Sequence, residues 1–428
     1  MADIPKSKWE RGLTGTRTAA KMGQKALKYL AMKPFLDEEE RIEARKTLNR
    51  ETAASLFQGL SLLKGTVLKM AQFLSMELDI FPPEVTKELQ KSYHQAPPIN
   101  RALVRKIVQN VLGKPPEQIF EAFDTMAFAA ASLGQVHRAT TRDGSRLAVK
   151  IQYPGIRETI QNDVQLMRSV LRRLHDYEII APAIEEIEVR LLEETDYRLE
   201  AQNMAFFRER LNMDLIMVPA LYGDFSADTV LSAEYMNGMT LNEWLRIELD
   251  QKKIDQVAQA LNDLFIFGLY RLNCIHADPN PGNFIVNGDS RIGLVDFGCV
   301  KRFDPEFVAV YGELSRTALH GDRDDYMHLS RALCGSGHYG STEVKDCTFE
   351  VFYQTSQWLG KLYREESFDF KANPEFMAAG KKKIADTFEC GRMGINTNFI
   401  FLHRTRYGLL RLFERMGARV CFRNPYEC

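Results

Sequence analysis

Apolar and polar positions in the first part of the chain follow a helical period. Between Glu38 and Glu77, apolar side chains recur every three or four residues, which predicts a helix with one apolar face. That face consists of Leu56, Leu60, Leu63, Val67, Met70 and Leu74. At about 100° per residue, Lys69 and Gln72 project from the opposite side. A second helical pattern runs through Val104–Leu112 and ends at Gly113, so residues 1–119 are predicted to form a helical extension.

From Phe120 the period changes to that of short strands. The segment FAAASLGQVHRAT predicts a strand, a turn of small residues and a second strand, and Asp143-Gly144 is typical of a hairpin turn before the strand RLAVKIQ. Helical patterns return over Ile156–His175 and Ile184–Leu211, and TVLSAEYM predicts one more strand. Residues 120–236 therefore form a predicted small, strand-rich lobe.

The remaining chain, residues 237–428, is predicted to be a larger and mainly helical lobe. Thr240 and Glu243 have the spacing of a capping box at a helix start. Two short strands are expected within residues 275–298. Asp304-Pro305-Glu306 has the form of an N-cap, a first-position proline and a first-turn acid, which predicts another helix start. The sequence thus indicates an α+β fold with two lobes and an N-terminal helical extension.

Composition narrows the classes of partner. Lysine and arginine (56) balance aspartate and glutamate (57), so the net charge gives no indication of a nucleic-acid partner. The seven cysteines are scattered without a C-x-x-C pair, which favours a reducing, cytoplasmic location over a disulfide framework or a zinc site. No apolar run approaches the roughly 20 residues that span a bilayer. The basic residues 1–35 fit either a solvated helix or peripheral contact with an anionic membrane surface.

The clearest chemical pattern lies in HADPNPGNF and the following LVDFG. His276, Asp278 and Asn283 fit H-x-D-x-x-x-x-N, and Asp296 begins a D-F-G triplet after a short apolar strand. Phosphoryl transfer needs a carboxylate that orients or deprotonates the acceptor, and oxygen ligands that hold Mg²⁺ on the phosphates. We assign the first role to Asp278 and the second to Asn283 and Asp296. Each motif alone is a common local turn, but their order and short separation favour the catalytic interpretation.

Two further features complete a nucleotide site. Lys150, in the strand RLAVKIQ, resembles the strand lysine that binds the α- and β-phosphates of ATP in kinases, and Glu200 is its expected helical partner. Small residues replace the expected glycine-rich phosphate loop, and alanine lacks the access of glycine to positive φ angles. The residues predicted to contact the nucleotide from this loop are Ala129, Ala130, Ala131, Ser132, Gln135 and Val136. By its order in the chain, the hinge at Glu234 to Met236 is predicted to meet the adenine.

Taken together, AAASLGQVH, AVKIQYPG, EETDYRLEAQN, HADPNPGN and DFG resemble the UbiB/AarF family of atypical kinases. The resemblance covers nearly the whole chain, including FLHRTRYGLLRLFERMGARV. It implies a protein-kinase-like fold, use of ATP or ADP with Mg²⁺, and a link to ubiquinone or other isoprenoid-lipid metabolism. The predicted partners are accordingly a nucleotide and a lipid or quinone-precursor small molecule.

The resemblance also assigns roles that the residue pattern alone does not. Glu194 and Asp196 match the E-x-D pair of the family, which makes Glu194 a further predicted metal ligand. Lys69 and Gln72 match its K-x-G-Q pattern, with Ala71 in place of the glycine. In the family this helix covers the catalytic cleft, which makes Lys69 and Gln72 further predicted catalytic residues. Without the resemblance, exposure of Lys69 and Gln72 to water would be the simpler interpretation.

Two other functions stay open at this level. One is a small-molecule kinase of the aminoglycoside- or choline-kinase type, which shares H-x-D-x-x-x-x-N. The other is a nucleotide-dependent regulator with little turnover. The early helix start at Asp304 leaves no room after D-F-G for the long activation segment of protein kinases, which disfavours a protein acceptor.

Overall fold

The computed structural model describes residues 99–131, 133–172, 177–321, 323–335, 346–389 and 397–428. The chain divides into two compact units: Met1–Tyr197 with Gly223–Ser232, and Arg198–Tyr222 with Ala233–Cys428. We call them the first and the second unit and describe each by itself. The predicted helix that carries Lys69 and Gln72 lies outside the described residues. The predicted domain boundaries at residues 119 and 236 stay predictions.

The first unit is built on a mainly antiparallel sheet with the strand order β1-β3-β4-β6. Its strands are β1 (Ala122–Phe123), β2 (Ala129–Ala131), β3 (Gly134–Thr140), β4 (Arg146–Gln152) and residues 230–232 of β6 (Val230–Glu234), with β2 paired to β3. The register of β3 and β4 runs from Gly134 opposite Gln152 to Thr140 opposite Arg146. In the turn between them, Gly144 has a φ of 87°, a conformation that favours glycine. The predicted hairpin is therefore confirmed.

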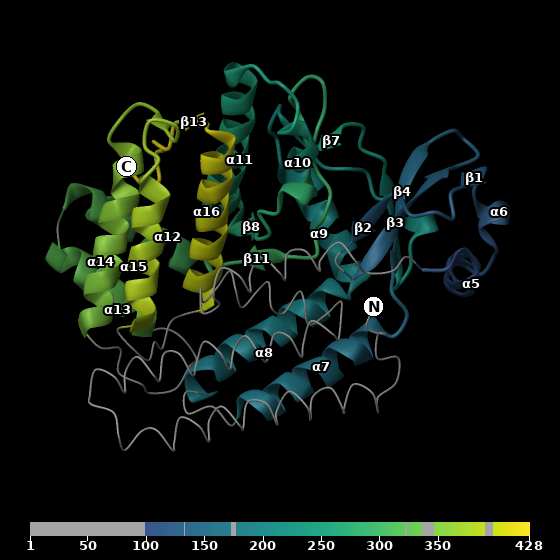
Figure 1. The fold of residues 1–428 in the computed structure, drawn as a ribbon, viewed down its shortest axis with the longest axis horizontal. Helices are drawn as coiled ribbons and strands as arrows, with labels where there is room; N and C mark the ends of the chain where they lie inside the picture. Colours follow the sequence, from purple (N-terminus) through teal and green to yellow (C-terminus); the bar gives the residue numbers. More distant parts are fainter. Residues whose placement is uncertain (1–98, 132, 173–176, 322, 336–345, 390–396) are drawn as a thin grey trace, which may run out of the picture. The chain divides into compact units, whose positions relative to one another are not determined.

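Four helices accompany this sheet in the described part of the first unit. They are α5 (Arg101–Leu112), α6 (Pro116–Ile119), α7 (Ile156–Leu171) and α8 (Tyr177–Glu194). Asn100 caps α5 by accepting a hydrogen bond from the backbone N–H of Ala102 at 2.8 Å, and Gly113 ends the helix with a φ of 79°. Helices α7 and α8 lie side by side and are joined by an ion pair between Arg168 and Glu188 at 2.8 Å (Figure 1).

The single helix predicted over Ile184–Leu211 is instead two helices. Helix α8 ends at Glu194, and α9 begins at Tyr197 (Tyr197–Arg210). At the break, Thr195 N–H bonds Leu192 O at 3.1 Å and Asp196 N–H bonds Glu193 O at 2.8 Å, so the ladder tightens to i→i+3 bonds and stops. The hydroxyl of Thr195 also donates to Leu192 O at 2.6 Å. The apolar period continues across this corner, which explains why the pattern suggested one helix.

The second unit has a four-stranded sheet and a separate two-stranded ribbon. The sheet has the order β5-β10-β9-β7, with β5 (Ile216–Met217), β7 (Met239–Thr240), β9 (Phe284–Val286) and β10 (Ile292–Leu294). The ribbon pairs β8 (Cys274–His276) with β11 (Val300–Arg302). Residues 275–298 thus contain parts or all of three strands rather than two. The extra one arises because Asn287 accepts hydrogen bonds from Asp289 N–H at 3.1 Å and Arg291 N–H at 2.9 Å, which closes a tight turn between β9 and β10.

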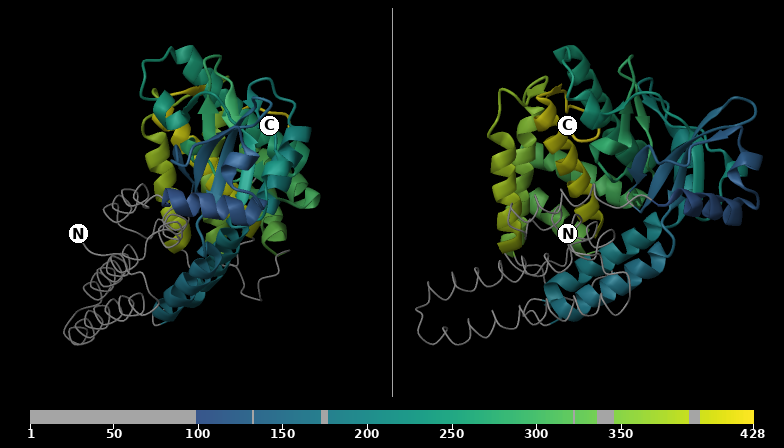
Figure 2. Two further views of the ribbon diagram at one scale, coloured as in Figure 1. Left: turned by 90° about the vertical axis from the view of Figure 1, so that its right-hand side faces the viewer. Right: turned by 45° about the vertical axis from the view of Figure 1, so that its right-hand side comes forward.

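Helices make up most of the second unit (Figure 2). In addition to α9 they are α10 (Leu241–Trp244), α11 (Gln251–Leu272), α12 (Pro305–His320), α13 (Arg323–Gly335), α14 (Asp346–Gly360), α15 (Phe376–Glu389) and α16 (Thr397–Met416). The short strands β12 (Phe368–Asp369) and β13 (Arg419–Val420) pair with each other. No helix in the described ranges combines the length and apolarity needed to cross a membrane.

Both predicted helix starts in this unit are confirmed. Thr240 and Glu243 form a reciprocal capping box, in which Glu243 N–H donates to Thr240 Oγ1 at 3.3 Å and Thr240 N–H donates to Glu243 Oε2 at 2.9 Å. Asp304 caps α12 by accepting a hydrogen bond from Glu306 N–H at 2.8 Å, with Pro305 as the first helical residue. These local rules depend on residues three or fewer positions apart, so sequence is enough to predict them.

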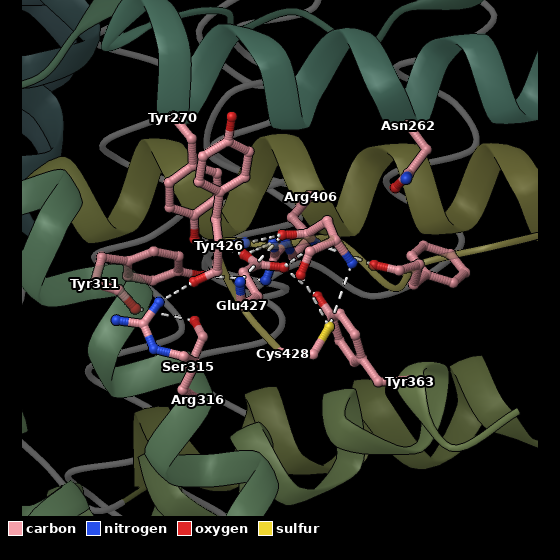
Figure 3. A network of polar contacts seen from close by, with 12 residues as sticks. Asn262, Tyr270, Tyr311, Ser315, Arg316, Tyr363, Arg406, Tyr426, Glu427 and Cys428 are labelled. Carbon is pink, nitrogen blue, oxygen red and sulfur yellow. Dashed lines mark hydrogen bonds and ion pairs between the residues drawn. The ribbon is translucent and has the colours of Figure 1, made fainter. Parts of the chain in front are cut away.

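A buried polar cluster fastens the segment after β13 to this helical unit (Figure 3). The carboxylate of Glu427 pairs with Arg406 of α16 and accepts hydrogen bonds from the hydroxyls of Tyr270 of α11, at 2.8 Å, and of Tyr363. The ring of Tyr270 stacks on that of Tyr426, with centroids 4.7 Å apart. Glu427 is fully buried, so its charge is compensated by these partners rather than by water.

Candidate active site

The H-x-D-x-x-x-x-N segment folds into a tight loop between β8 and β9. Asn280 caps a single 3-10 turn, Pro281–Asn283, by accepting a hydrogen bond from Gly282 N–H at 2.9 Å. This turn brings Asn283 back to Asp278: its Nδ2–H donates to Asp278 Oδ2 at 2.9 Å. Helix α16 packs closely against the loop, since a Cβ on Gly408 would lie 2.4 Å from Pro279. Two of the predicted catalytic and metal-binding residues are therefore in direct contact.

The D-F-G triplet lies next to this loop in the second unit. His276 is buried, and its Nε2–H donates to the carbonyl oxygen of Asp296, because a carbonyl can only accept. Val295 N–H donates to Asn283 O at 3.1 Å, a second bond between the two motifs. The Asp296 carboxylate accepts a hydrogen bond from Gly298 N–H at 3.0 Å, which orients it. The second unit thus places Asp278, Asn283 and Asp296 in one hydrogen-bonded arrangement.

Helix α9 is attached to the same triplet through two polar side chains one turn apart. Glu200, 1% exposed, accepts a hydrogen bond from Phe297 N–H at 3.4 Å. Asn203 donates to Phe297 O at 3.2 Å. The Phe297 ring is buried and packs against Phe207 of α9, with centroids 5.6 Å apart. Glu200 therefore contacts the D-F-G backbone, a role that the sequence did not suggest. Its predicted pairing with Lys150 joins residues of different units and stays a prediction.

In the first unit, Lys150 lies on β4 opposite Val136 of β3. Its ammonium group is 5.2 Å from the centroid of the Tyr197 ring, which is buried. Two residues along the same strand, Gln152 donates a hydrogen bond to Thr195 O at 2.9 Å. That bond fixes the corner between α8 and α9 to β4, so the E-x-D pair is held beside the strand of Lys150.

The two acids of the E-x-D pair have opposite environments. Glu194 is buried, at 8% exposure, while Asp196 is exposed. The tight turn that ends α8 explains this difference. Its i→i+3 hydrogen bonds wind the backbone by about 120° per residue, so side chains two positions apart point in different directions. Glu194 is thus the buried acid of the pair and Asp196 the exposed one, while the role of Glu194 as a metal ligand stays a prediction.

The alanine-rich segment is a short hairpin arm. Ala129, Ala130 and Ala131 pair with Val136, Gln135 and Gly134, and Ser132 lies outside the described residues. Ala129 and Ala130 are exposed. Gly134 is required by packing, since a Cβ there would lie 2.3 Å from the carbonyl oxygen of Ile151. The side chain of Gln135 is buried and bonded within the protein, so any contact of this residue with a nucleotide would come from its backbone.

The predicted hinge residues lie in the second unit with different exposures. Glu234 is exposed, and its backbone N–H and carboxylate both bond Ala220, at 2.8 Å to its O and 3.1 Å to its N–H. Met236 packs on β10, where a Cβ on Gly293 would lie 2.8 Å from its Cε. The hinge is therefore attached to the segment after β5 through Ala220 and to β10 through Gly293, while its role towards adenine stays a prediction.

Comparison with known proteins places this arrangement in a family. The model of the ABC1 atypical kinase-like domain matches residues 91–330, which include the alanine-rich arm, Lys150, the E-x-D pair, H-x-D-x-x-x-x-N and D-F-G, but neither the helix of Lys69 and Gln72 nor the late segment FLHRTRYGLLRLFERMGARV. The chain belongs to this ABC1 family of atypical kinases. The UbiB/AarF resemblance and the α+β kinase-like fold predicted from the sequence are thereby confirmed.

Several members of the ABC1 family are similar over much of this chain. Atypical kinase COQ8B of Rattus norvegicus is 30% identical over 67% of the chain and 55% of its own length. AarF domain-containing protein kinase 1 of Mus musculus is 28% identical over 70% and 59%, respectively. The chloroplastic protein ACTIVITY OF BC1 COMPLEX KINASE 7 of Arabidopsis thaliana is 30% identical over 60% and 38%. The chain thus spans between about two fifths and three fifths of the length of these relatives.

A solved structure extends the comparison to most of the fold. The Mycobacterium tuberculosis protein Rv3197, solved in complex with erythromycin, is 25% identical and has a TM-score of 0.62. The match covers 89% of this chain and 96% of the other.

The donor set of this ABC1 chain fits Mg²⁺ held jointly with a substrate. Among the described residues, no three His, Cys, Asp or Glu side chains converge on one point. Mg²⁺ at phosphate-transfer sites is bound through one or two protein oxygens and completed by phosphate oxygens and water. Asn283 turns its Nδ2 towards Asp278, which directs its Oδ1 elsewhere, and Asp296 supplies a carboxylate oriented by Gly298. These two oxygen donors suit such a shared site.

The sequence reasoning overlooked the residues that support these motifs. Asn203 and Gln152 each attach a motif to a backbone carbonyl that is distant in sequence. For Asn203 a signal existed, since its spacing of three from Glu200 puts two polar side chains on one face of a short helix. Gln152 lies at the end of a strand beside apolar residues, and nothing local distinguishes it from a solvent-exposed glutamine.

Proposed function

We propose that this chain is a Mg²⁺-dependent atypical kinase or ATPase that binds ATP or ADP and supports ubiquinone or other isoprenoid-lipid metabolism. The observation that carries the proposal is the contact of Asp278 with Asn283, bonded through His276 and Val295 to the segment of Asp296. The names of the relatives, atypical kinases among them, support the reaction class.

Each residue of the arrangement has a separate task in this proposal. The amide of Asn283 holds one oxygen of Asp278, which leaves the carboxylate directed at an acceptor hydroxyl or water that it orients or deprotonates. Asn283 and Asp296 would hold Mg²⁺, which when bound neutralises charge on the phosphates. Lys150 would bind the α- and β-phosphates, with Glu200 as its partner and Glu194 as a further acid near the metal. The exposed Ala129 and Ala130 would approach the phosphates from β2, which pairs with β3, the neighbour of the strand of Lys150.

The acceptor is more easily a small molecule or water than a protein. The chain continues from Gly298 into β11 and then into α12 at Pro305, so the segment that forms the peptide platform in protein kinases is replaced by a strand and a helix. Phosphorylation of a soluble small molecule is a second candidate function. It is supported by the replacement of the peptide platform and by the erythromycin complex of the similar M. tuberculosis protein. A cytoplasmic location with peripheral membrane contact is part of the proposal, and the free thiols of Cys274, Cys421 and Cys428 support a reducing compartment.

Two substitutions separate the metal role from the base role. Asp296→Ala should abolish the Mg²⁺-dependent thermal stabilisation by ATP, because it removes a metal ligand. Asp278→Asn should keep that stabilisation and lower turnover by about 10²–10⁴-fold, because it removes a base without removing a ligand. Asp289→Ala, an exposed acid in the turn before β10, is the control and should match the wild type in both assays.

The outcomes divide the candidates. Full stabilisation of Asp296→Ala by Mg-ATP would refute the assignment of the metal site. Equal, slow turnover in Asp278→Asn and wild type would favour a nucleotide-dependent regulator instead. Phosphate release by the wild type should rise with anionic lipid vesicles and a phenolic quinone-precursor mimic; a rise with soluble small molecules only would favour the second candidate.

A further inference from the structure

A continuous chain of hydrogen bonds crosses the interior of the first unit. Gln135 and His137 are two positions apart on β3 and therefore lie on the same face of the strand. Both side chains are buried, at 2% and 0% exposure, although glutamine and histidine are polar. Buried polar groups in proteins are almost always hydrogen-bonded, because an unpaired one costs free energy of folding. The hydrogen bonds of these two side chains therefore contribute to the stability of the unit. We call Ile99, Gln135, His137 and Asp124 the relay.

The chemistry of the relay allows one arrangement of protons. Asp124 O lies 2.9 Å from Nδ1 of His137 and can only accept, so Nδ1 carries the proton. In the neutral ring Nε2 is then an acceptor, and it receives a hydrogen bond from Nε2–H of Gln135 at 2.9 Å. This leaves Gln135 Oε1 to accept from the backbone N–H of Ile99 at 3.0 Å. Burial lowers the pKa of His137, against the opposing influence of Asp124, which favours the neutral ring that the relay requires.

The ends of the relay belong to different parts of the chain. Ile99 precedes Asn100, the cap of α5, and is therefore the point where the chain enters that helix. Gln135 pairs in register with Ala130 of the alanine-rich arm, and Asp124 lies just before that arm. The ring of Phe123 stacks on His137, with centroids 5.6 Å apart and an interplanar angle of 16°. The relay thus joins the entrance of α5 to both sides of the arm. Its donors and acceptors cannot be swapped without the loss of a hydrogen bond.

We propose that Gln135 and His137 are positioning residues: they fix the entrance of α5 to the alanine-rich arm and thereby set the affinity of the arm for nucleotide phosphates. This inference rests on the proposed nucleotide site. Neither side chain needs to touch the nucleotide, since both are buried. Their effect passes through the backbone of Ala130, which shares its strand pairing with Gln135, and of Ile99.

Reversing the polarity of the relay gives a test with a distinctive sign. In Gln135→Glu the carboxylate still accepts from Ile99 N–H but offers no donor to Nε2 of His137. The relay then requires a protonated ring, which donates at both nitrogens. The charged groups that act on the ring are the new carboxylate and Asp124, whose carboxylate accepts from Met126 N–H at 2.8 Å, and both favour protonation. The variant should therefore be intact at low pH and disrupted at high pH.

The wild-type relay should be disrupted only by acid, because burial lowers the pKa of His137 and favours the neutral ring. Protonating its ring would place two donors, Nε2–H of His137 and the amide of Gln135, against each other. An amide flip to relieve this would turn the amide nitrogen towards Ile99 N–H and release the entrance of α5. Between pH 6 and pH 8 the wild type should therefore change little, whereas Gln135→Glu should weaken as the pH rises, a difference that loss of general stability would not produce.

The experiment uses the full chain at pH 6 and pH 8. Hydrogen exchange is measured in the peptide that contains Ile99, and Mg-ADP affinity is measured by calorimetry. For Gln135→Glu we expect the protection of the Ile99 amide, taken relative to its intrinsic exchange rate at each pH, and the affinity both to fall by about fivefold from pH 6 to pH 8, the worth of roughly one hydrogen bond. Gln135→Met, which has no polar end, should show the weakened values at both pH values. Thr141→Val, which removes a buried hydroxyl just beyond the far end of β3, is the control and should match the wild type.

Each result decides the inference. A loss of amide protection and of affinity from pH 6 to pH 8 in Gln135→Glu, with little change in the wild type, would support it. Equal exchange and equal affinity in wild type, Gln135→Glu and Gln135→Met would overturn it, and so would a change in exchange without any change in affinity. If the wild type fails to bind Mg-ADP at all, the proposed function fails together with the affinity step, whereas the exchange profile still shows whether the relay holds α5.

Discussion

Replacing Glu427 by glutamine would remove one charge from the interior of the second unit with almost no change of volume. Glu427 is fully buried and pairs with Arg406, whose side chain is 11% exposed. Glutamine can still accept from one hydroxyl, but it leaves a buried guanidinium without a counter-charge. Breaking a buried ion pair from one side costs about 3–5 kcal/mol, and we expect about 3 kcal/mol because part of the hydrogen bonding survives.

The measurement is urea unfolding followed by tryptophan fluorescence. Trp244 and Trp358 are both buried in the second unit, and a Trp9→Phe background removes the third tryptophan of the chain. Glu350→Gln is the matched control, because Glu350 pairs with Arg323 at 2.7 Å while both side chains are more than a third exposed. The same chemical change there should cost less than about 1 kcal/mol.

The pH dependence provides an independent check. Burial alone would raise the pKa of Glu427, but the Arg406 guanidinium and the hydrogen bonds from Tyr363, Arg406 and Tyr270 together lower it. A carboxyl group with a lowered pKa contributes stability that is present above its unfolded value of 4.5 and is lost as the pH falls below that value. Glu427→Gln should therefore lose less stability than the wild type between pH 5 and pH 3.

Two results would refute this account of the cluster. One is a cost for Glu427→Gln no larger than that of Glu350→Gln, which would mean that water solvates the charges. The other concerns Arg406→Met combined with Glu427→Gln: this pair leaves no lone buried charge, so it should be more stable than the sum of the single changes predicts. Strict additivity would show that the two side chains do not depend on each other.

Two other predictions concern packing and histidine. Gly134→Ala should destabilise the first unit by about 1–3 kcal/mol, because its Cβ would lie 2.3 Å from Ile151 O. Gly223→Ala is the control, because a Cβ there would have no atom within 4 Å; equal thermal shifts of the two variants in circular dichroism would contradict the prediction. Burial, with the nearby Arg406 charge, lowers the pKa of His403 to about 4, so its unfolded form binds more protons below pH 6.5 and stability should fall from there towards pH 4. His403→Phe should flatten this slope in urea midpoints measured at pH 7 and pH 5, and an unchanged slope would assign it to other groups.

Sequence reasoning succeeded where the deciding residues are close together in the chain. The turn at Gly144, the capping box of Thr240 and the cap at Asp304 each depend on neighbours within a few positions, and all three are confirmed. The contact of Asp278 with Asn283 was also predictable, because a proline-rich turn of five residues can bring them together. Local rules therefore gave the motifs and much of the element order.

The supporting contacts could not be predicted, because they join residues far apart in sequence. Glu200 and Phe297 are separated by 97 positions, and Glu427 and Tyr270 by 157. The corner at Thr195 was missed for a different reason: the apolar period continues across it, and a few i→i+3 bonds decide the break. Lys69 and Gln72 lie outside the described residues, so their predicted function as part of a cover over the site stays a prediction.

The position of Glu427 also has a consequence for folding during synthesis. The carboxylate of Glu427 is synthesised after all of its partners: 157 residues after Tyr270, 64 after Tyr363 and 21 after Arg406. Until residue 427 is present, burial of Arg406 would leave its positive charge without a counter-charge in an apolar interior. The helices around Arg406 therefore stay loosely packed and hydrated until then. Domains generally fold as units while the chain grows, at about 5–20 residues per second. Here the first unit can complete its sheet at residue 232, whereas the second must wait for residue 427, about 10–40 s later at that rate, with its aromatic core open to chaperones.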